Sequence, residues 1–247
     1  MRLSKFGALA LAGQVCLLAA SYDNTQQKSF PLSGSGERRL SVENIQGNIR
    51  VVADSGSEVR ITAKEHYTAD TESALSRART DVRLEMVQTG NVVKVSLEGP
   101  FRDRDRNSWR QRRDEDDRYN FRHDFEVSVP RDIAGFGRIK TVNGGVKASF
   151  RENPAKPVLF ETINGELDAT FQPGLNADVK LSTMHGDVFT DFDVQTMAMP
   201  VSMETKDGGK RIRIDRDRGI KVGNGGIEHS FKTLNGSIKI RKSGNSK

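Results

Sequence analysis

A phrase of about twelve residues recurs along this chain, and its sixth position is a glycine in every occurrence. Seven repeats are present, and they read VENIQGNIRVVA from Val42, IKTVNGGVKASF from Ile139, FETINGELDATF from Phe160, LSTMHGDVFTDF from Leu181, METKDGGKRIRI from Met203, IKVGNGGIEHSF from Ile220 and FKTLNGSIKIRK from Phe231. From the second repeat onward, successive glycines are 21, 21, 22, 17 and 11 residues apart. A spacing near 20 residues is typical of repeat architectures, in which each unit packs against its neighbours.

Within each repeat, apolar residues or threonine alternate with polar residues before the glycine, and most repeats alternate again after it. This period of two predicts two short strands, each with one buried face. The fifth position is mostly Asn or Asp, and such a residue before glycine favours a tight turn, because glycine takes positive φ without steric cost. The predicted turn residues are Asn143 and Gly144, Asn164 and Gly165, His185 and Gly186, Asp207 and Gly208, Asn224 and Gly225, and Asn235 and Gly236.

Two architectures fit this pattern. One is a meander of antiparallel hairpins, and the other is a β-solenoid-like stack in which each strand–turn–strand unit of about 20 residues forms one rung. Each unit also contains a second, looser connection, such as RENPAKP or QPGLNAD, which a rung with two turns explains. We therefore favour an all-β fold with stacked rungs over residues 121–242, ending in a shorter rung that acts as a cap. Threonines at the third position would then form a ladder of Thr141, Thr162, Thr183, Thr205 and Thr233.

Residues 38–100 are expected to form a β part that contains the one short helix. The segment EVRITAKEHY alternates as a strand, and TADTESALSRAR has a helical pattern with Thr68 or Asp70 as its N-cap. The segment DVRLEMVQTGNVVKVSLEG predicts two strands joined by a tight turn around Gly90.

The first 21 residues have the three-part form of a secretory signal peptide. Arg2 and Lys5 precede a short apolar run, and small residues follow it at positions 19–21. An uncleaved membrane anchor is the alternative. Cys16, the one cysteine of the chain, follows Val15 and not a small residue, so we interpret it as part of the signal and not as a lipid attachment site. We expect residues 22–37 to form a flexible linker.

Residues 101–120 form a mixed-charge segment with few apolar residues. Such a segment cannot bury a core, and we expect a disordered, solvated loop. We expect the same of the tail at residues 243–247. The net charge falls from +6 to +4 when Arg2 and Lys5 are left out. This basic balance does not indicate nucleic acid as a partner, because the chain is expected to be exported and is poor in aromatic residues.

The sequence gives little evidence of catalysis. The four histidines do not form a cluster with metal-ligand spacing, His185 occupies a turn position, and His229 falls on the polar phase of a strand, where it would face solvent. The chain contains no G-x-S-x-G elbow and no phosphate-binding loop with Lys-Ser/Thr. We therefore predict a protein that is not an enzyme, with no catalytic residue, no cofactor and no metal.

Two basic stretches near the C-terminus could bind an anionic surface, such as lipid headgroups or acidic cell-wall polysaccharide. The alternative is a charged cap that keeps the last rung soluble. The candidate contacts are Lys210, Arg211, Arg213, Lys239, Arg241 and Lys242.

The series FEVSVP, TVNGGV, TINGEL, TMHGDV and TLNGSIKI resembles the bacterial "putative adhesin" β-strand-repeat domain family, a domain of unknown function. The resemblance covers about residues 40–242. It implies a β-solenoid-like domain in a secreted or cell-envelope protein, and it carries no catalytic residues. The Met203 and Ile220 repeats depart from the pattern, with Lys210 at an apolar position and Val222 in place of threonine.

Three functional hypotheses follow. The first is an exported, non-enzymatic, adhesin-like binding module of the bacterial envelope, located in the periplasm, on the cell surface or outside the cell. The second is an envelope-stress regulator that contacts the membrane, cell-wall components or another envelope protein. The third and least favoured is a carbohydrate-active β-helix enzyme, which would need carboxylates clustered on adjacent rungs. The sequence does not determine the oligomeric state.

Overall fold

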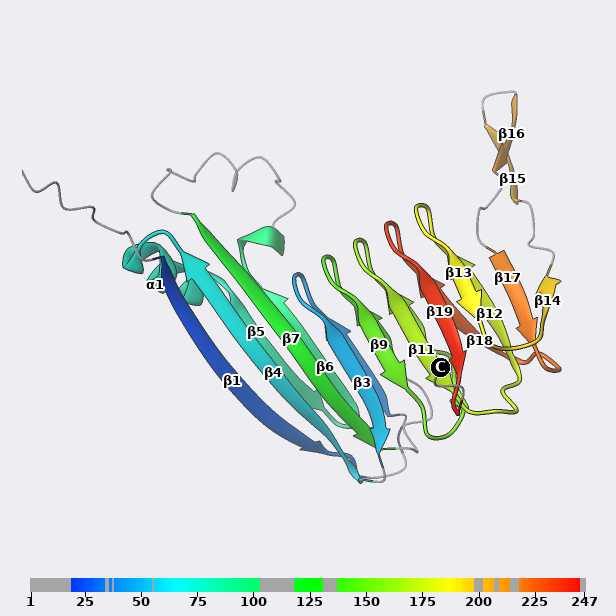
Figure 1. The fold of residues 1–247 in the computed structure, drawn as a ribbon, viewed down its shortest axis with the longest axis horizontal. Coiled ribbons are helices and arrows are strands. Elements are labelled where there is room, and N and C mark those ends of the chain that lie inside the picture. Colours follow the sequence, from blue (N-terminus) through cyan, green and yellow to red (C-terminus); the bar gives the residue numbers. More distant parts are fainter. Residues whose placement is uncertain are drawn as a thin grey trace, which may run out of the picture.

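The computed structural model describes residues 19–33, 36, 38–54, 56–102, 118–130, 137–197, 202–206, 209–213 and 218–244, with only the backbone at 54, 202–206, 209–213 and 218. These residues form two large, open sheets with one α-helix at one end (Figure 1). The predicted all-β class with a single short helix is confirmed, and both sheets mix parallel and antiparallel strands.

The eight-stranded first sheet has the order β1-β4-β7-β3-β9-β11-β19-β13. Its strands are β1 (Ala20–Pro31), β3 (Ile49–Asp54), β4 (Glu58–Ala69), β7 (Tyr119–Pro130), β9 (Val146–Ser149), β11 (Leu167–Phe171), β13 (Val188–Thr190) and β19 (Ile238–Lys242).

The nine-stranded second sheet has the order β14-β17-β12-β18-β10-β8-β2-β6-β5. Its strands are β2 (Arg39–Glu43), β5 (Arg83–Thr89), β6 (Val92–Glu98), β8 (Arg138–Lys140), β10 (Leu159–Glu161), β12 (Ala177–Ser182), β14 (Val194–Met197), β17 (Arg218–Val222) and β18 (Ile227–Lys232). The remaining elements are the helix α1 (Glu72–Asp81), the 3-10 turn η1 (Pro100–Arg102) and the separate pair β15 (Ser202–Lys206) and β16 (Gly209–Arg213).

In five of the seven repeats, the glycine turn carries the chain from the second sheet to the first. These corner turns, at residues 44–48, 141–145, 162–166, 183–187 and 233–237, line up in a row along one border of the molecule (Figure 1). Their fifth positions form parallel bridges in the order Gln46, Asn143, Asn164, Asn235 and His185. The glycine turn is therefore a corner between sheets and not the turn of a hairpin.

The order of this row differs from the order of the chain. The last repeat, with β18 and β19, lies between the Phe160 repeat and the Leu181 repeat. The expectation that the last repeat caps the fold is therefore wrong. The Leu181 repeat lies at the end of the row instead, because β19 pairs on both of its edges.

Two repeats do not join the row. The Met203 repeat forms the antiparallel pair β15–β16, and its turn residues Asp207 and Gly208 lie outside the described residues. In the Ile220 repeat, the turn at Asn224 and Gly225 leads from β17 to β18 within the second sheet, where both strands flank β12. The residue before the fifth position is apolar in all five corner turns but is lysine or glycine in these two repeats.

Glycine is required in the corner turns because neighbouring turns approach each other through their backbones. A Cβ atom on Gly165 would lie 2.0 Å from the carbonyl oxygen of Gly144. The same clash arises between Gly144 and Gly47, and between Gly236 and Gly165. Gly144 and Gly236 also have positive φ angles of 151° and 153°, but Gly165 is not among the positive-φ glycines. At Gly165 the close approach, and not the backbone angle, therefore excludes a side chain.

The threonines of the third position bind these same carbonyl oxygens. The Thr162 hydroxyl donates to Gly144 O at 2.9 Å, and the Thr233 hydroxyl donates to Gly165 O at 3.0 Å. Thr141 and Thr183 make the equivalent bonds, and Asn44 takes this role in the first corner turn. Four members of the predicted threonine ladder thus each bind a carbonyl of the neighbouring corner turn in the row, whereas Thr205 lies on β15, outside the row.

The core lies between the two sheets and contains packed aromatic rings, of which Phe150 and Phe171 are stacked and Phe160 and Phe231 meet edge to face. The rings of Phe150 and Phe171 lie 4.8 Å apart, and the rings of Phe160 and Phe231 lie 5.3 Å apart. His229 was expected to face solvent but is fully buried against Phe171, because it shares the inward phase of β18 with Phe231. Burial lowers the pKa of His229 to about 4.

The N-terminal part differs from the prediction in two respects. Residues 20–31 form β1, which pairs with β4 along its whole length, so a flexible linker over residues 22–37 is wrong for this stretch. Ala20 is buried, and a signal-peptide boundary after residue 21 would remove the start of β1. The sequence did not indicate this strand because most of its side chains are exposed.

The helix begins later than predicted. Its N-cap is Thr71, whose hydroxyl accepts a hydrogen bond from Ala74 N, because β4 extends to Ala69 and includes Thr68. The predicted hairpin around Gly90 is confirmed as β5–β6. Most of the charged segment, residues 103–117, lies outside the described residues, as do residues 1–18 and 245–247. Within the described part of the chain, no helix is both long and apolar enough to span a membrane.

We expect the substitution Gly165→Ala to destabilise the fold by more than about 2 kcal/mol, since the added Cβ must displace the backbone of the neighbouring turn. Urea unfolding measures the effect. The matched control is Gly56→Ala, where the nearest atom to the new Cβ is the end of the Arg60 side chain at 3.7 Å. Equal stabilities of the two variants would contradict the close packing of the corner turns.

We expect Thr162→Val to lower the free energy of unfolding by about 1–3 kcal/mol, because valine keeps the shape but removes the donor to a buried carbonyl. Thr162→Ser retains the hydroxyl and is expected to lose less. The same unfolding measurement compares the two variants. A valine variant as stable as wild type would show that this hydrogen bond contributes nothing.

Stability should fall as the pH falls from 6.5, the ordinary pKa of histidine, toward 4, because the unfolded chain binds a proton at His229 that the folded chain does not. We expect His229→Asn, which does not titrate, to reduce the stability lost between pH 7.5 and pH 5 by roughly 2 kcal/mol. Urea unfolding at both pH values tests this expectation, with the exposed His66→Asn as control. An unchanged pH dependence in His229→Asn would contradict the assignment.

Candidate interaction site

The end of the row of corner turns exposes an unpaired strand. β13 pairs with β19 along one edge, and no described residue pairs with its other edge (Figure 1). The register places Val188, Phe189 and Thr190 beside Ile238, Lys239 and Ile240. The edge carries backbone donors and acceptors that a further strand could use.

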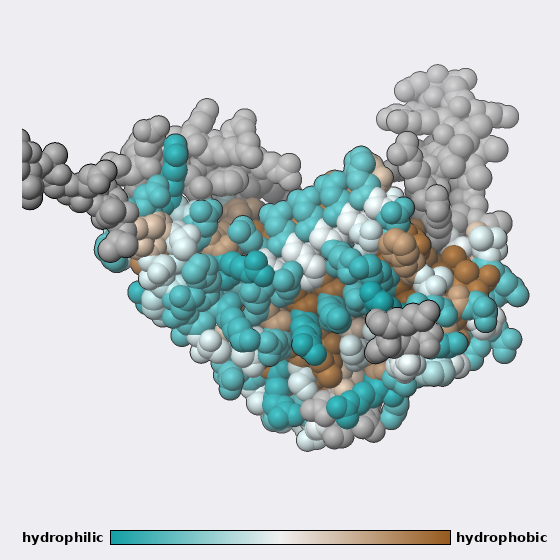
Figure 2. All heavy atoms as spheres, in the orientation of Figure 1, coloured by the Kyte–Doolittle hydropathy of each residue, from teal (hydrophilic) through white to brown (hydrophobic). Residues whose placement is uncertain are grey.

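Apolar side chains surround this edge. Met184 is 55% exposed and Phe189 is 52% exposed, the two largest exposures among the large hydrophobic side chains described. In Figure 2, apolar surface appears at this end of the molecule beside the largely hydrophilic outer face of the first sheet. An exposed apolar patch next to an open edge is a typical sign of a binding site.

The corner turn at residues 183–187, which leads into β13, borders a hollow of about 610 Å³. Where a sixth corner turn would stack on the row, the structure has this hollow instead. Its lining residues are Leu181, Thr183, Met184, Gly186, Asp187, Val188 and Phe189.

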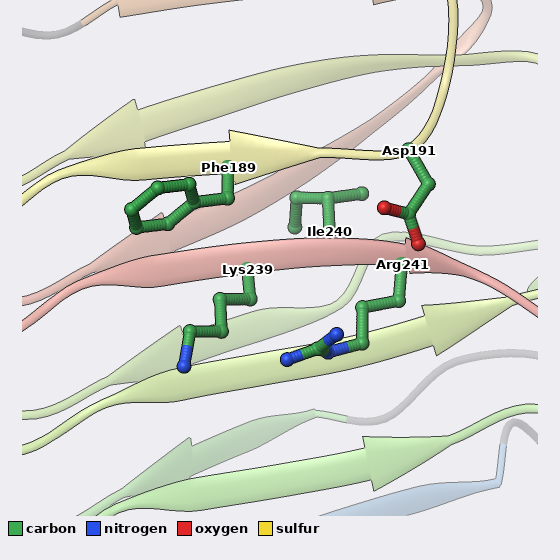
Figure 3. Close-up of a pocket in the computed structure, with 5 residues that line it drawn as sticks. All are labelled: Phe189, Asp191, Lys239, Ile240 and Arg241. Carbon is green, nitrogen blue, oxygen red and sulfur yellow. The ribbon is translucent and has the colours of Figure 1, made fainter. Parts of the chain in front are cut away.

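A second hollow of about 290 Å³ lies on the outer face of β13 and β19, and Figure 3 shows its lining. Phe189 lies on β13 and Asp191 directly follows it, while Lys239 and Arg241 lie on β19. The two basic side chains extend away from β13, toward β11. The side of the hollow at β13 is therefore apolar and acidic.

Both basic side chains already have carboxylate partners. Arg241 Nε donates to Asp168 Oδ1 at 3.0 Å, and Lys239 forms an ion pair with Glu166. Lys147 on β9 lies 4.0 Å from the other oxygen of Asp168. Basic and acidic strands therefore alternate across this part of the sheet, in the order β9, β11, β19 and β13.

The six predicted anion contacts divide between two places. Lys239, Arg241 and Lys242 lie on β19, inside the first sheet, where the Lys242 ammonium lies 5.5 Å from the ring centre of Phe192. Lys210, Arg211 and Arg213 lie on β16, of which only the backbone is described. Asp168 and Glu166 already partly neutralise Arg241 and Lys239, so these two side chains would attract an anionic surface less strongly.

The predicted turn residues of the row form a ladder of polar side chains on the surface. Asn164 Nδ2 donates to Asn143 Oδ1 at 2.7 Å, and Asn235 Nδ2 donates to Asn164 Oδ1 at 2.6 Å. His185 Nδ1 lies 3.0 Å from Asn235 Oδ1 and ends the ladder at the open edge. The side chains of the fourth position run beside this ladder: Ile45, Val142, Ile163, Leu234 and Met184.

A cluster of titratable side chains lies on β4 and β7, away from β13 in the strand order of the first sheet. Tyr67 Oη lies 3.2 Å from His123 Nε2, and Glu65 lies 3.9 Å from the same nitrogen. Burial lowers the pKa of His123 to about 4 and raises the pKa of Glu65. His123 is fully buried and Glu65 is 7% exposed, so the cluster is closed to a substrate.

The residues described by the structure include no group of His, Cys, Asp and Glu side chains that could hold a metal ion. The outward carboxylates of β11 and β13 are separated by the basic strand β19. The described carboxylates of β11 and β13 are therefore not paired across neighbouring strands, as glycoside hydrolysis would need at this face.

Comparisons with known proteins give no family. No family model and no curated protein matches the chain. Among solved structures, a putative cell adhesion protein from Clostridium sporogenes is 11% identical, with a TM-score of 0.47 over 90% of this chain and 100% of that one.

A putative adhesin from Bacteroides fragilis is 8% identical, with a TM-score of 0.31 over 89% of this chain and 97% of that one. A putative adhesin from Parabacteroides merdae is also 8% identical, with a TM-score of 0.27 over 88% and 95%. TM-scores below 0.5 do not establish a shared fold, and these similarities indicate no function for this chain.

Proposed function

We propose that this protein is an exported, non-enzymatic interaction module of the bacterial envelope, built on a solenoid-like stack of repeats, and that it binds its partner at the open end of the row. The observation that carries this proposal is the unpaired edge of β13, with the exposed side chains of Met184 and Phe189 beside a hollow of about 610 Å³. Open edges and apolar patches favour association with another molecule.

Three further observations support a binding role. The N-terminal residues have the pattern of a secretory signal, which favours export. The outward Asp168 of β11 lies between basic partners on β9 and β19 and not beside another carboxylate, which does not favour glycosidase chemistry at this face. The open end is hydrogen-bonded to the row of corner turns, and a preorganised surface loses less entropy on binding.

The experiment compares binding of the chain from residue 19 onward to three probes: vesicles of phosphatidylcholine alone, vesicles that also contain phosphatidylglycerol, and purified cell-wall sacculi together with their bound proteins. Co-sedimentation at low and high salt measures the binding. We expect retention on an envelope fraction, and we expect the double variant Met184→Ser, Phe189→Ser to weaken it at least about tenfold.

The matched control is Val87→Ser, since Val87 is 51% exposed but lies on β5, at the opposite edge of the second sheet. It should bind like wild type, and all variants should have equal melting temperatures. The proposal fails if no fraction retains the chain, or if the double variant binds as well as the control.

A further inference from the structure

The outer edge of β13 has a defined backbone pattern. Ile238 N donates to Asp187 O, and Asp191 N donates to Ile240 O, so residues 187, 189 and 191 use their backbone groups toward β19. In a parallel ladder the intervening residues point the other way. The N–H and C=O groups of Val188 and Thr190 are therefore directed at the open edge, where they can pair with an added strand.

On the outer face of this edge, two acidic side chains flank one aromatic side chain. Asp187, Phe189 and Asp191 alternate along the strand, and all three are exposed. Each strand in the order β9, β11, β19 and β13 has charges opposite to those of its neighbour, with Lys147 and Arg241 on either side of Asp168. Continuation of this alternation past β13 requires a basic strand.

β19 is the basic strand that pairs with the other edge of β13, and its own Lys239 and Arg241 side chains turn toward β11. In the backbone register Lys239 is the partner of Phe189, and Arg241 lies two residues farther along, lining the same hollow as Asp191. A lysine or arginine across from Phe189 can place its charge over the ring, while its neighbours two residues away meet the two aspartates.

We propose that β13 binds an extended segment of a partner protein that carries lysine or arginine at alternate positions, and that this segment adds to the first sheet as a parallel strand. The inference rests on the proposed function, whose partner class it specifies. Two copies of this chain joined by antiparallel β13 strands would place Asp187 opposite Asp191 of the other copy, and like charges directly opposite each other are destabilising.

The probe is a fluorescently labelled peptide with the sequence GSIKIRKSG, which reproduces residues 236–244 around β19. Fluorescence anisotropy measures its binding to the chain from residue 19 onward. We expect salt-sensitive binding, and we expect no binding of the acidic peptide GSIEIEESG. The double variant Asp187→Asn, Asp191→Asn should bind the basic peptide at least about tenfold more weakly.

Two further variants locate the contact. Thr190→Pro removes an outward N–H without removing a hydrogen bond to β19, and should abolish binding while circular dichroism shows an intact fold. Glu85→Gln removes an exposed acid from β5, at the far edge of the second sheet, and should leave the affinity unchanged.

The proposal is overturned if the basic and acidic peptides bind equally, or if the two aspartates can be replaced without loss of affinity. Self-association that requires Asp187 and Asp191 would also overturn it, since a second copy would then occupy the edge. Envelope binding without peptide binding would contradict only this inference, and peptide binding without envelope binding would contradict only the proposed function.

Discussion

The close approach of backbone to backbone between corner turns is the constraint on which the structure depends. The carbonyl oxygen of one turn lies where the Cβ of the next turn would be, at 2.0 Å between Gly144 and Gly165. The same oxygen accepts the hydroxyl of Thr162. One carbonyl thus explains both the glycine and the threonine of the repeat, and it fixes the register of two sheets at once, because every turn joins a strand of one sheet to a strand of the other.

This regularity also produces the open end. A row of identical contacts has to stop somewhere, and its last member keeps surfaces that the others bury. Here the last member is the Leu181 repeat, whose β13 has an unpaired edge and whose Phe189 and Met184 are exposed. At the other end, the second sheet finishes in the hairpin β5–β6, and the helix α1 packs against β1, β4 and β7 of the first sheet. The candidate site is therefore a consequence of the architecture.

Sequence patterns identified the repeat but not which repeats would join the row. The apolar residue before the fifth position separates the five members from the other two, which have Lys206 and Gly223 there, and this signal is visible in the sequence. The burial of His229 has no such signal. Because histidine is a polar residue type, the sequence pattern placed it on the solvent-facing side of β18, whereas it lies on the buried side. The strand β1 was missed for a related reason: its polar side chains show no alternation, and its pairing with β4 is made by the backbone.

The sequence by itself determined the β class, the single helix, the positions of the turns and the candidate basic residues, because alternation, glycine and charge are local properties of the chain. Only the tertiary structure decided the order of the row, since insertion of the last repeat between two earlier ones is a long-range pairing without a local signal. It also decided the site. The pairing of Arg241 with Asp168 and the exposure of Phe189 depend on which strands become neighbours, and neighbours distant in sequence are chosen by packing and not by local pattern.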